Sequence, residues 1–149
     1  MRKKVLLFIG GLVLGVVIYI GFQMYQTNQL ELITVEDIQT FDVSTNDELN
    51  ENTIIHVEVD VGNFEALAMA QTEVVKDTIY LMIYKWPAIQ QVDEIDFDLE
   101  SIPGLEGITR IAVIYGDPFS GEGHEHGYFI NDLIDHPDQD VIWKKEDRE

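Results

Sequence analysis

The sequence contains no cysteine among its 149 residues. Disulfides, thiol catalysis, cysteine-ligated zinc and attachment to a membrane through an acylated cysteine are therefore excluded together. Whatever stabilises this chain must be noncovalent packing. An apolar fraction of 46% with 10% aromatics is too rich for a disordered chain and supplies enough side chains for a core.

Basic residues are also scarce, with 9 Lys and Arg against 28 Asp and Glu. Three of the nine, Arg2, Lys3 and Lys4, stand at the N-terminus, so 6 basic residues face all 28 acidic ones in the remainder, a formal net charge of −22. Such a surface repels nucleic acid and anionic lipid headgroups, and favours cations, basic polymers or basic partner proteins. Solubility in a cation-rich surrounding is the alternative explanation.

A long apolar segment follows the basic N-terminus, running uncharged from Val5 to Phe22. As a helix with a rise of 1.5 Å per residue it would cover about 27 Å, close to the roughly 30 Å hydrocarbon core of a bilayer. Tyr19 and Tyr25 fall where interfacial aromatic residues are expected. Residues 1–26 are therefore predicted to be a short cytoplasmic segment and a single membrane anchor.

A cleaved signal peptide is the competing interpretation of this segment. The apolar run exceeds the roughly 7 to 15 residues of a signal h-region, and no small-x-small cleavage site follows it. An uncleaved anchor is favoured, with the basic N-terminus in the cytoplasm and the C-terminal domain outside the cell. Gly11 and Gly15 have the G-x-x-x-G spacing of helix dimers, although glycines are common in membrane helices.

Residues 27–53 are predicted to form a stalk that contains a short helix or a first strand. Thr34 and Asp37 have the spacing of a capping box, which favours one or two helical turns over 35–41. Residues 45–52 read TNDELNEN, a polar stretch without periodicity that is typical of a linker.

Residues 54–149 are predicted to be an extracytoplasmic β domain. Ile55, Val57, Val59 and Val61 alternate with polar residues, as in a half-buried strand. Further strands are expected over 64–71, 78–86, 94–99, 108–115, 128–130 and 141–144. Short strands at this spacing, separated by Gly, Pro, Asn and Asp, favour an antiparallel sandwich or barrel.

The layout resembles a known class of protein. The basic N-terminus, apolar anchor and acidic stalk, with TIYLMIY at 78–84, ITRIAVIY at 108–115 and DVIWKK at 140–145, resemble small envelope-anchored immunoglobulin-like proteins of Gram-positive bacteria. The resemblance implies a mainly β fold, a small antiparallel, immunoglobulin-like β-sandwich after a transmembrane helix, and no catalytic residue. An exported domain without disulfides also favours a Gram-positive envelope.

One glycine-rich segment, GDPFSGEGHEHG at 116–127, has residues that could bind a metal. His124 and His126 would share one face of an extended segment, a geometry suited to holding one divalent cation, with Asp117 and Glu122 or Glu125 as further ligands. A glycine-rich acidic turn is the alternative explanation.

Other candidate sites are weaker. Tyr80, Met82, Tyr84 and Trp86 form a stripe that could stack on a sugar or peptide, but core is the expected role. The acidic runs 93–100 and 132–140 suggest calcium binding, but they lack the residue spacing of an EF-hand loop. Ser120 lies near His124 without a G-x-S-x-G motif, so no catalytic residue is assigned.

The function expected from these features is non-enzymatic: a single-pass, membrane-anchored envelope protein whose outer domain binds a protein or basic-polymer partner, and no nucleic acid. Two alternatives remain open. One is a metal-dependent enzyme or ion sensor, using Zn²⁺ or Ca²⁺ at His124 and His126. The other is an accessory subunit of a membrane complex.

Overall fold

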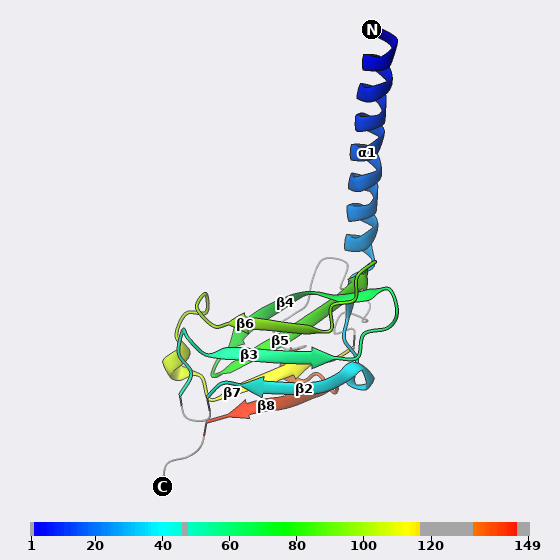
Figure 1. Cartoon of the computed structure of the whole chain (residues 1–149). Helices are drawn as coiled ribbons and strands as arrows, with labels where there is room; N and C mark the ends of the chain where they lie inside the picture. Colours follow the sequence, from blue (N-terminus) through cyan, green and yellow to red (C-terminus); the bar gives the residue numbers. More distant parts are fainter. Residues whose placement is uncertain (1, 46–47, 117–132, 146–149) are drawn as a thin grey trace. The chain divides into compact units, whose positions relative to one another are not determined.

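The computed structural model describes residues 2–45, 48–116 and 133–145, which form two compact units, Met1–Leu30 and Glu31–Glu149. The first unit is one helix, α1 (Arg2–Asn28), drawn in blue in Figure 1. Its segment Phe8–Gln26, 19 residues with a mean hydropathy of 1.9, is long and apolar enough to cross a membrane. Apolar side chains surround this segment on all sides instead of forming one stripe, unlike those of a helix packed on a soluble core.

The second unit is built almost entirely of strands. Its elements are β1 (Glu31–Leu32), η1 (Val35–Asp37), β2 (Ile38–Val43), β3 (Ile54–Val59), β4 (Glu65–Val75), β5 (Thr78–Pro87), β6 (Glu94–Asp98), η2 (Leu105–Gly107), β7 (Arg110–Ile114) and β8 (Gln139–Lys144). They form a five-stranded sheet and a three-stranded sheet. The prediction of a mainly β, two-sheet domain after an apolar helix is confirmed.

Strand β5 organises the five-stranded sheet. Strand β4 pairs along its whole length on one side, while β7 and β1 pair with successive parts of its other side, and β8 pairs with β7. The β5–β7 pair is parallel, so the prediction of a wholly antiparallel sandwich is wrong at this point. After β5 the chain crosses to the other sheet as β6 and returns beside β5, and such a crossover makes the two strands parallel.

The main core lies between the two sheets, and Figure 1 shows β2, β3 and β6 in front of the larger sheet. Alternate residues of β3 and β5 fill it, none more than 1% exposed: Ile55, Val57, Val59, Ile79, Leu81 and Ile83. Because successive side chains of a strand point to opposite faces, the period-two pattern of the sequence placed these residues correctly.

The other face of β5 is buried as well. Tyr80 and Met82 are 6% and 0% exposed, and they pack in a second apolar cluster with Ala112, Ile114 and Leu133. The expectation that this stripe is core is confirmed for these two residues, whereas Tyr84 and Trp86 are only half-buried.

The segment expected as a stalk is largely part of the domain. Strand β1 pairs with β5, β2 pairs with β3, and Ile33 between them is fully buried in the main core. The first strand that the sequence allowed in this segment is present as β2, the outer strand of the three-stranded sheet. The capping box is present, with the Asp37 Oδ2 accepting from the Thr34 N–H at 2.7 Å, but it caps a single 3-10 turn.

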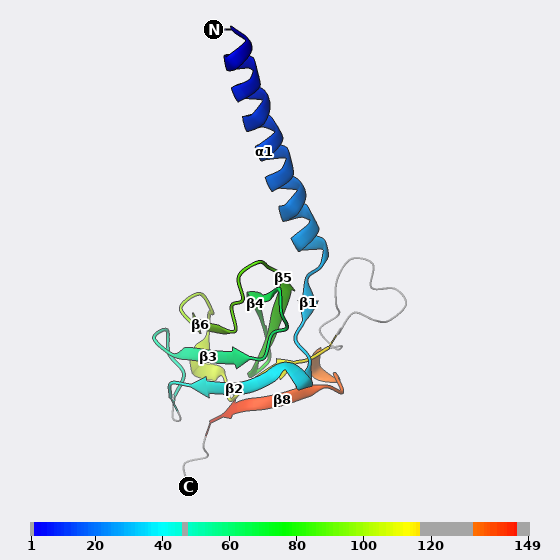
Figure 2. The same ribbon diagram turned by 45° about the vertical axis from the view of Figure 1, so that its right-hand side comes forward.

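The two sheets approach each other where β2 passes β8, as both Figure 1 and Figure 2 show. The indole N–H of Trp143 in β8 donates to the Thr45 carbonyl at 2.8 Å, just beyond β2. This bond satisfies the one polar group of an aromatic side chain that is otherwise buried in the main core.

A partly buried ion cluster joins the sheets at the opposite end of β2. The Lys85 ammonium of β5 lies 3.2 Å from Asp37 Oδ2 and 3.4 Å from Glu65 Oε2 of β4. Burial lowers the pKa of Lys85, but the hydrogen bond and charge of Asp37 and the charge of Glu65 outweigh it, so the pKa is raised. The pKa of Asp37 is lowered, since hydrogen bonds from Thr34 and Lys85 outweigh the effect of its burial.

Replacing Lys85 with Met should destabilise the domain by about 1 to 3 kcal/mol, because two partly buried carboxylates lose their shared cation. Thermal unfolding of the full-length protein measures this. Lys144→Met, at an exposed position of β8, is the matched control and should change the stability by less than about 0.5 kcal/mol. Equal effects of the two variants would contradict a stabilising role for the cluster.

Candidate functional site

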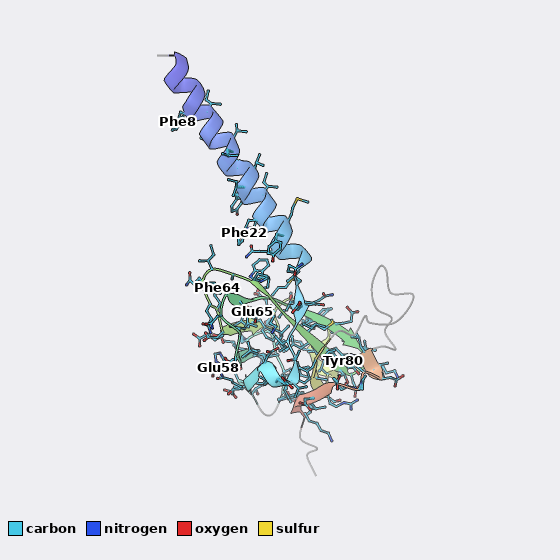
Figure 3. The ribbon with its side chains drawn as sticks, turned by 90° about the vertical axis from the view of Figure 1, so that its right-hand side faces the viewer. Phe8, Phe22, Glu58, Phe64, Glu65 and Tyr80 are labelled. Atoms are coloured by element: carbon cyan, nitrogen blue, oxygen red, sulfur yellow. The ribbon has the colours of Figure 1, made fainter. Side chains whose placement is uncertain are left out.

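The outer face of the three-stranded sheet carries an unusual set of side chains. In antiparallel pairs, residues directly opposite each other share a face. His56 of β3 lies between Asp42 of β2 and Asp96 of β6, and Glu58 of β3 lies opposite Glu94 of β6. With Asp98, opposite Ile54, these residues define the acidic face: Asp42, His56, Glu58, Glu94, Asp96 and Asp98. Glu58 is labelled in Figure 3.

The alternation of each strand sorts these residues away from the core. Phe41, Val57 and Ile95 share the inner side of the same sheet and contact the main core. A shift of one residue in the pairing would turn the whole acidic set inward, so burial of the apolar side holds the register.

Among the residues that β2, β3 and β6 contribute, His56 is the one that can carry a positive charge. Its Nδ1 lies 2.5 Å from Asp96 Oδ1. The hydrogen bond to Asp96 is the main cause that raises the pKa of His56, and the charges of Asp96, Glu94 and Glu58 add to it against a smaller opposing effect of desolvation. The imidazolium form is thus favoured at higher pH than in an isolated histidine.

His56 is also the basic residue that the charges of Glu58 and Glu94 reach within the three strands. None of the residues of β2, β3 and β6 is Lys or Arg. Like charges directly opposite each other on one face of a sheet are destabilising. On the acidic face, five carboxylates therefore share the single imidazole of His56.

A shallow depression extends the acidic face at the start of β3. It has a volume of about 530 Å³ and is lined by Glu51, Asn52, Ile54, Asp98 and Glu100. Ile54 is 45% exposed among three carboxylates. An exposed apolar side chain among carboxylates suits a long basic side chain, whose methylene stem and charged end need different surroundings.

Metal binding is not indicated within residues 2–45, 48–116 and 133–145, where no three His, Asp or Glu side chains come together as a set of ligands. Asp96 and Asp98 lie on the exposed side of β6, as the alternation in the sequence predicted. The predicted metal set of His124, His126, Asp117 and Glu122 lies outside the described residues, so it stays a prediction.

No family model, no curated protein and no solved structure matches the chain. The geometry of the acidic face is therefore the basis on which a function can be assigned. Sequence reasoning assigned outward positions to His56, Glu58, Asp96 and Asp98, but it missed the row Asp42, His56, Asp96. Asp42 lies in the expected stalk, and no local pattern shows which strands pair.

Titration of His56 tests the geometry of the acidic face. Asp96→Asn should bring the pKa of His56 down toward the ordinary value of 6.5, whereas Asp98→Asn, two residues along β6, should change it much less. NMR of the imidazole resonances measures this, with His56→Gln providing the assignment. An unchanged His56 pKa in Asp96→Asn would contradict the pairing.

The same pair predicts the sign of a pH effect on stability. Because folding raises the pKa of His56, the protonated imidazole contributes to folding stability. This contribution is fully present below about pH 6.5 and is lost as the pH rises through the folded-state pKa of His56. The destabilisation caused by Asp96→Asn should accordingly be larger at pH 6 than at pH 9.

Proposed function

We propose that the chain is a single-pass, membrane-anchored, non-enzymatic binding protein whose extracytoplasmic domain holds a basic partner on the acidic face. The observation that carries the proposal is that Glu58 lies opposite Glu94, next to the row Asp42, His56, Asp96, so that five carboxylates share one imidazole on this face. A cationic polymer or a basic protein segment would relieve the repulsion that the sheet bears alone.

The anchoring part of the proposal is supported by α1. Its apolar segment Phe8–Gln26 has the length and composition of a membrane span, and a signal sequence would satisfy the same two criteria. The anchor is favoured because no small-x-small cleavage site follows the segment. Arg2, Lys3 and Lys4 before it favour a cytoplasmic N-terminus.

The binding part is supported by charge and shape together. A formal net charge of −22 after the first basic residues attracts cations from a distance, and the depression at Ile54 provides a local place for one long side chain. The immunoglobulin-like arrangement and the Gram-positive envelope, both suggested by the layout of the sequence, remain part of the proposal. The parallel β5–β7 pair departs from the antiparallel arrangement expected of such domains.

Binding of an oligolysine peptide to the full-length protein in phosphatidylcholine nanodiscs tests the role of the acidic face. The combined variant Glu58→Gln, Glu94→Gln, Asp98→Asn should weaken binding about tenfold, which is about 1.4 kcal/mol. Added NaCl should weaken binding to the unmodified protein, because exposed charges are screened.

A matched control separates the face from the total charge. The control variant also removes three negative charges, but from exposed positions outside the acidic face: Glu31→Gln, Glu106→Gln, Asp135→Asn. This control should bind nearly as well as the unmodified protein. Equal losses in the two variants would show that only net charge matters and would overturn the proposed site.

The absence of cysteine makes the topology simple to test. In a Val141→Cys variant the single thiol lies at an exposed position of β8 and should react with a membrane-impermeant maleimide in intact cells. A cysteine inserted after Met1 should react only once the cells are permeabilised. The reverse pattern would contradict an extracytoplasmic domain.

A further inference from the structure

Two uncharged stretches, 61–64 and 86–92, lie together at one end of the domain, bordered by Asp60 and Asp93. Residues 61–64 follow Asp60 in the connection from β3 to β4, and residues 86–92 include the end of β5 and the connection toward β6 as far as Asp93. We call them the tip loops. The Ala88 N–H donates to the Phe64 carbonyl at 2.7 Å, and the Gln91 side chain donates to the Val61 carbonyl at 3.3 Å. The tip loops are thus bonded into one surface.

Their apolar side chains project into solvent. Phe64 is 74% exposed and Ile89 is 86% exposed, the two largest values for large hydrophobic residues in the described part of the domain. Val92 adds a third exposed apolar side chain, at 41%. Figure 3 shows Phe64 and Glu65 at one end of the domain, away from Tyr80.

The backbone at Phe64 is strained to hold this position. Its φ is 67°, in the left-handed region where glycine or asparagine is the usual residue and a bulky side chain is an outlier. The conformation is held by the Ala88 bond and by the Glu65 N–H, which donates to the Gly62 carbonyl at 3.1 Å. An exposed phenylalanine in a strained turn reduces folding stability, which points to a role in binding.

The tip loops lie at the end of the domain where the chain arrives from α1. Only Gln29 and Leu30 separate the helix from β1, and Glu31 of β1 pairs with Lys85, two residues before Pro87. Covalent geometry keeps the start of β1 within about 10 Å of Asn28 at any angle between the two units. If α1 spans a membrane, the tip loops are held close to its surface.

We propose that Phe64 and Ile89 insert into the outer surface of the bilayer that α1 spans, so that the domain is docked on lipid by its tip loops. The inference rests on the proposed anchoring. The contact is apolar, because the strongly acidic domain repels anionic headgroups, whereas the tip loops carry no charge themselves and expose Phe64 and Ile89. The short tether makes docking intramolecular, so two side chains suffice where an untethered domain would need a larger surface.

Docking would also orient the binding site. Strand β3 runs from Ile54, in the acidic depression, to Val59 beside the tip-loop end, where the Val59 N–H donates to the Asp93 carbonyl at 2.9 Å. With the tip loops in lipid, the depression faces away from the membrane, toward whatever partner the envelope presents.

Fluorescence quenching on the full-length protein tests the proposal. A bimane probe is attached through Gln90→Cys, an exposed tip-loop position that leaves Phe64 and Ile89 intact, in phosphatidylcholine vesicles that contain doxyl-labelled lipid. We expect the doxyl lipid to quench this probe and to leave unaffected a probe at Asn52→Cys, beside the depression at the other end of β3.

The decisive variant combines Gln90→Cys with Phe64→Asn and Ile89→Ser. Asparagine tolerates the left-handed backbone, so the turn should persist, and a thermal melt checks the fold. Because the tether is unchanged, loss of quenching in this variant assigns the docking to the two apolar tips. Quenching that persists shows that the tether alone brings the loop near lipid, and it overturns the proposal.

Flotation of the same vesicles separates this inference from the anchoring on which it rests. Protein that fails to float with the vesicles contradicts the anchor itself. Protein that floats while the probe at residue 90 remains unquenched contradicts docking alone. Shielding of that probe from an aqueous quencher without quenching by doxyl lipid would show that the tips contact protein, and it would also overturn docking on lipid.

Discussion

The domain depends on the burial of strand β5 on both of its faces. Every residue from Thr78 to Ile83 is buried. Such a strand needs hydrogen-bonding neighbours on both edges, which β4, β7 and β1 supply, and an apolar cover on each face. The three-stranded sheet covers one face, so the position of β3, and with it the acidic face, follows from the need to bury Ile79, Leu81 and Ile83.

The distribution of charge follows from the same requirement. Glu94, Asp96 and Asp98 occupy alternate positions of β6, as His56 and Glu58 do in β3, and the core excludes them to the outer side of the sheet. The register then sets like charges opposite each other, with Glu58 facing Glu94, while His56 lies between Asp42 and Asp96 and pairs with Asp96. By contrast, the partly buried Lys85 is fully paired with Asp37 and Glu65, and it joins the two sheets.

The two ends of the domain differ in the side chains that they expose, which gives the proposed functions a common geometry. One end has the uncharged tip loops and the entry of the chain from α1, and the other has the acidic depression beside Asp98 and Glu100. Strand β3 links them. In an anchored domain whose tip loops contact lipid, the acidic depression would therefore lie on the side farthest from the membrane, where it would attract positively charged groups.

The sequence by itself determined the elements whose signal is local. Composition sufficed for the apolar helix, because spanning length and absence of charge need no partner. Period-two alternation sufficed for the inward residues of β3 and β6, and a continuous apolar run marked β5 as a strand buried on both sides.

The tertiary structure alone decided which strands pair. The parallel β5–β7 contact, the recruitment of β2 from an expected stalk and the row Asp42, His56, Asp96 all join segments distant in the sequence. Local periodicity records which side of a strand is buried but not which strand lies next to it. That choice is made by the total apolar surface that the assembled sheets bury, so the acidic face and the strained Phe64 turn became visible only in three dimensions.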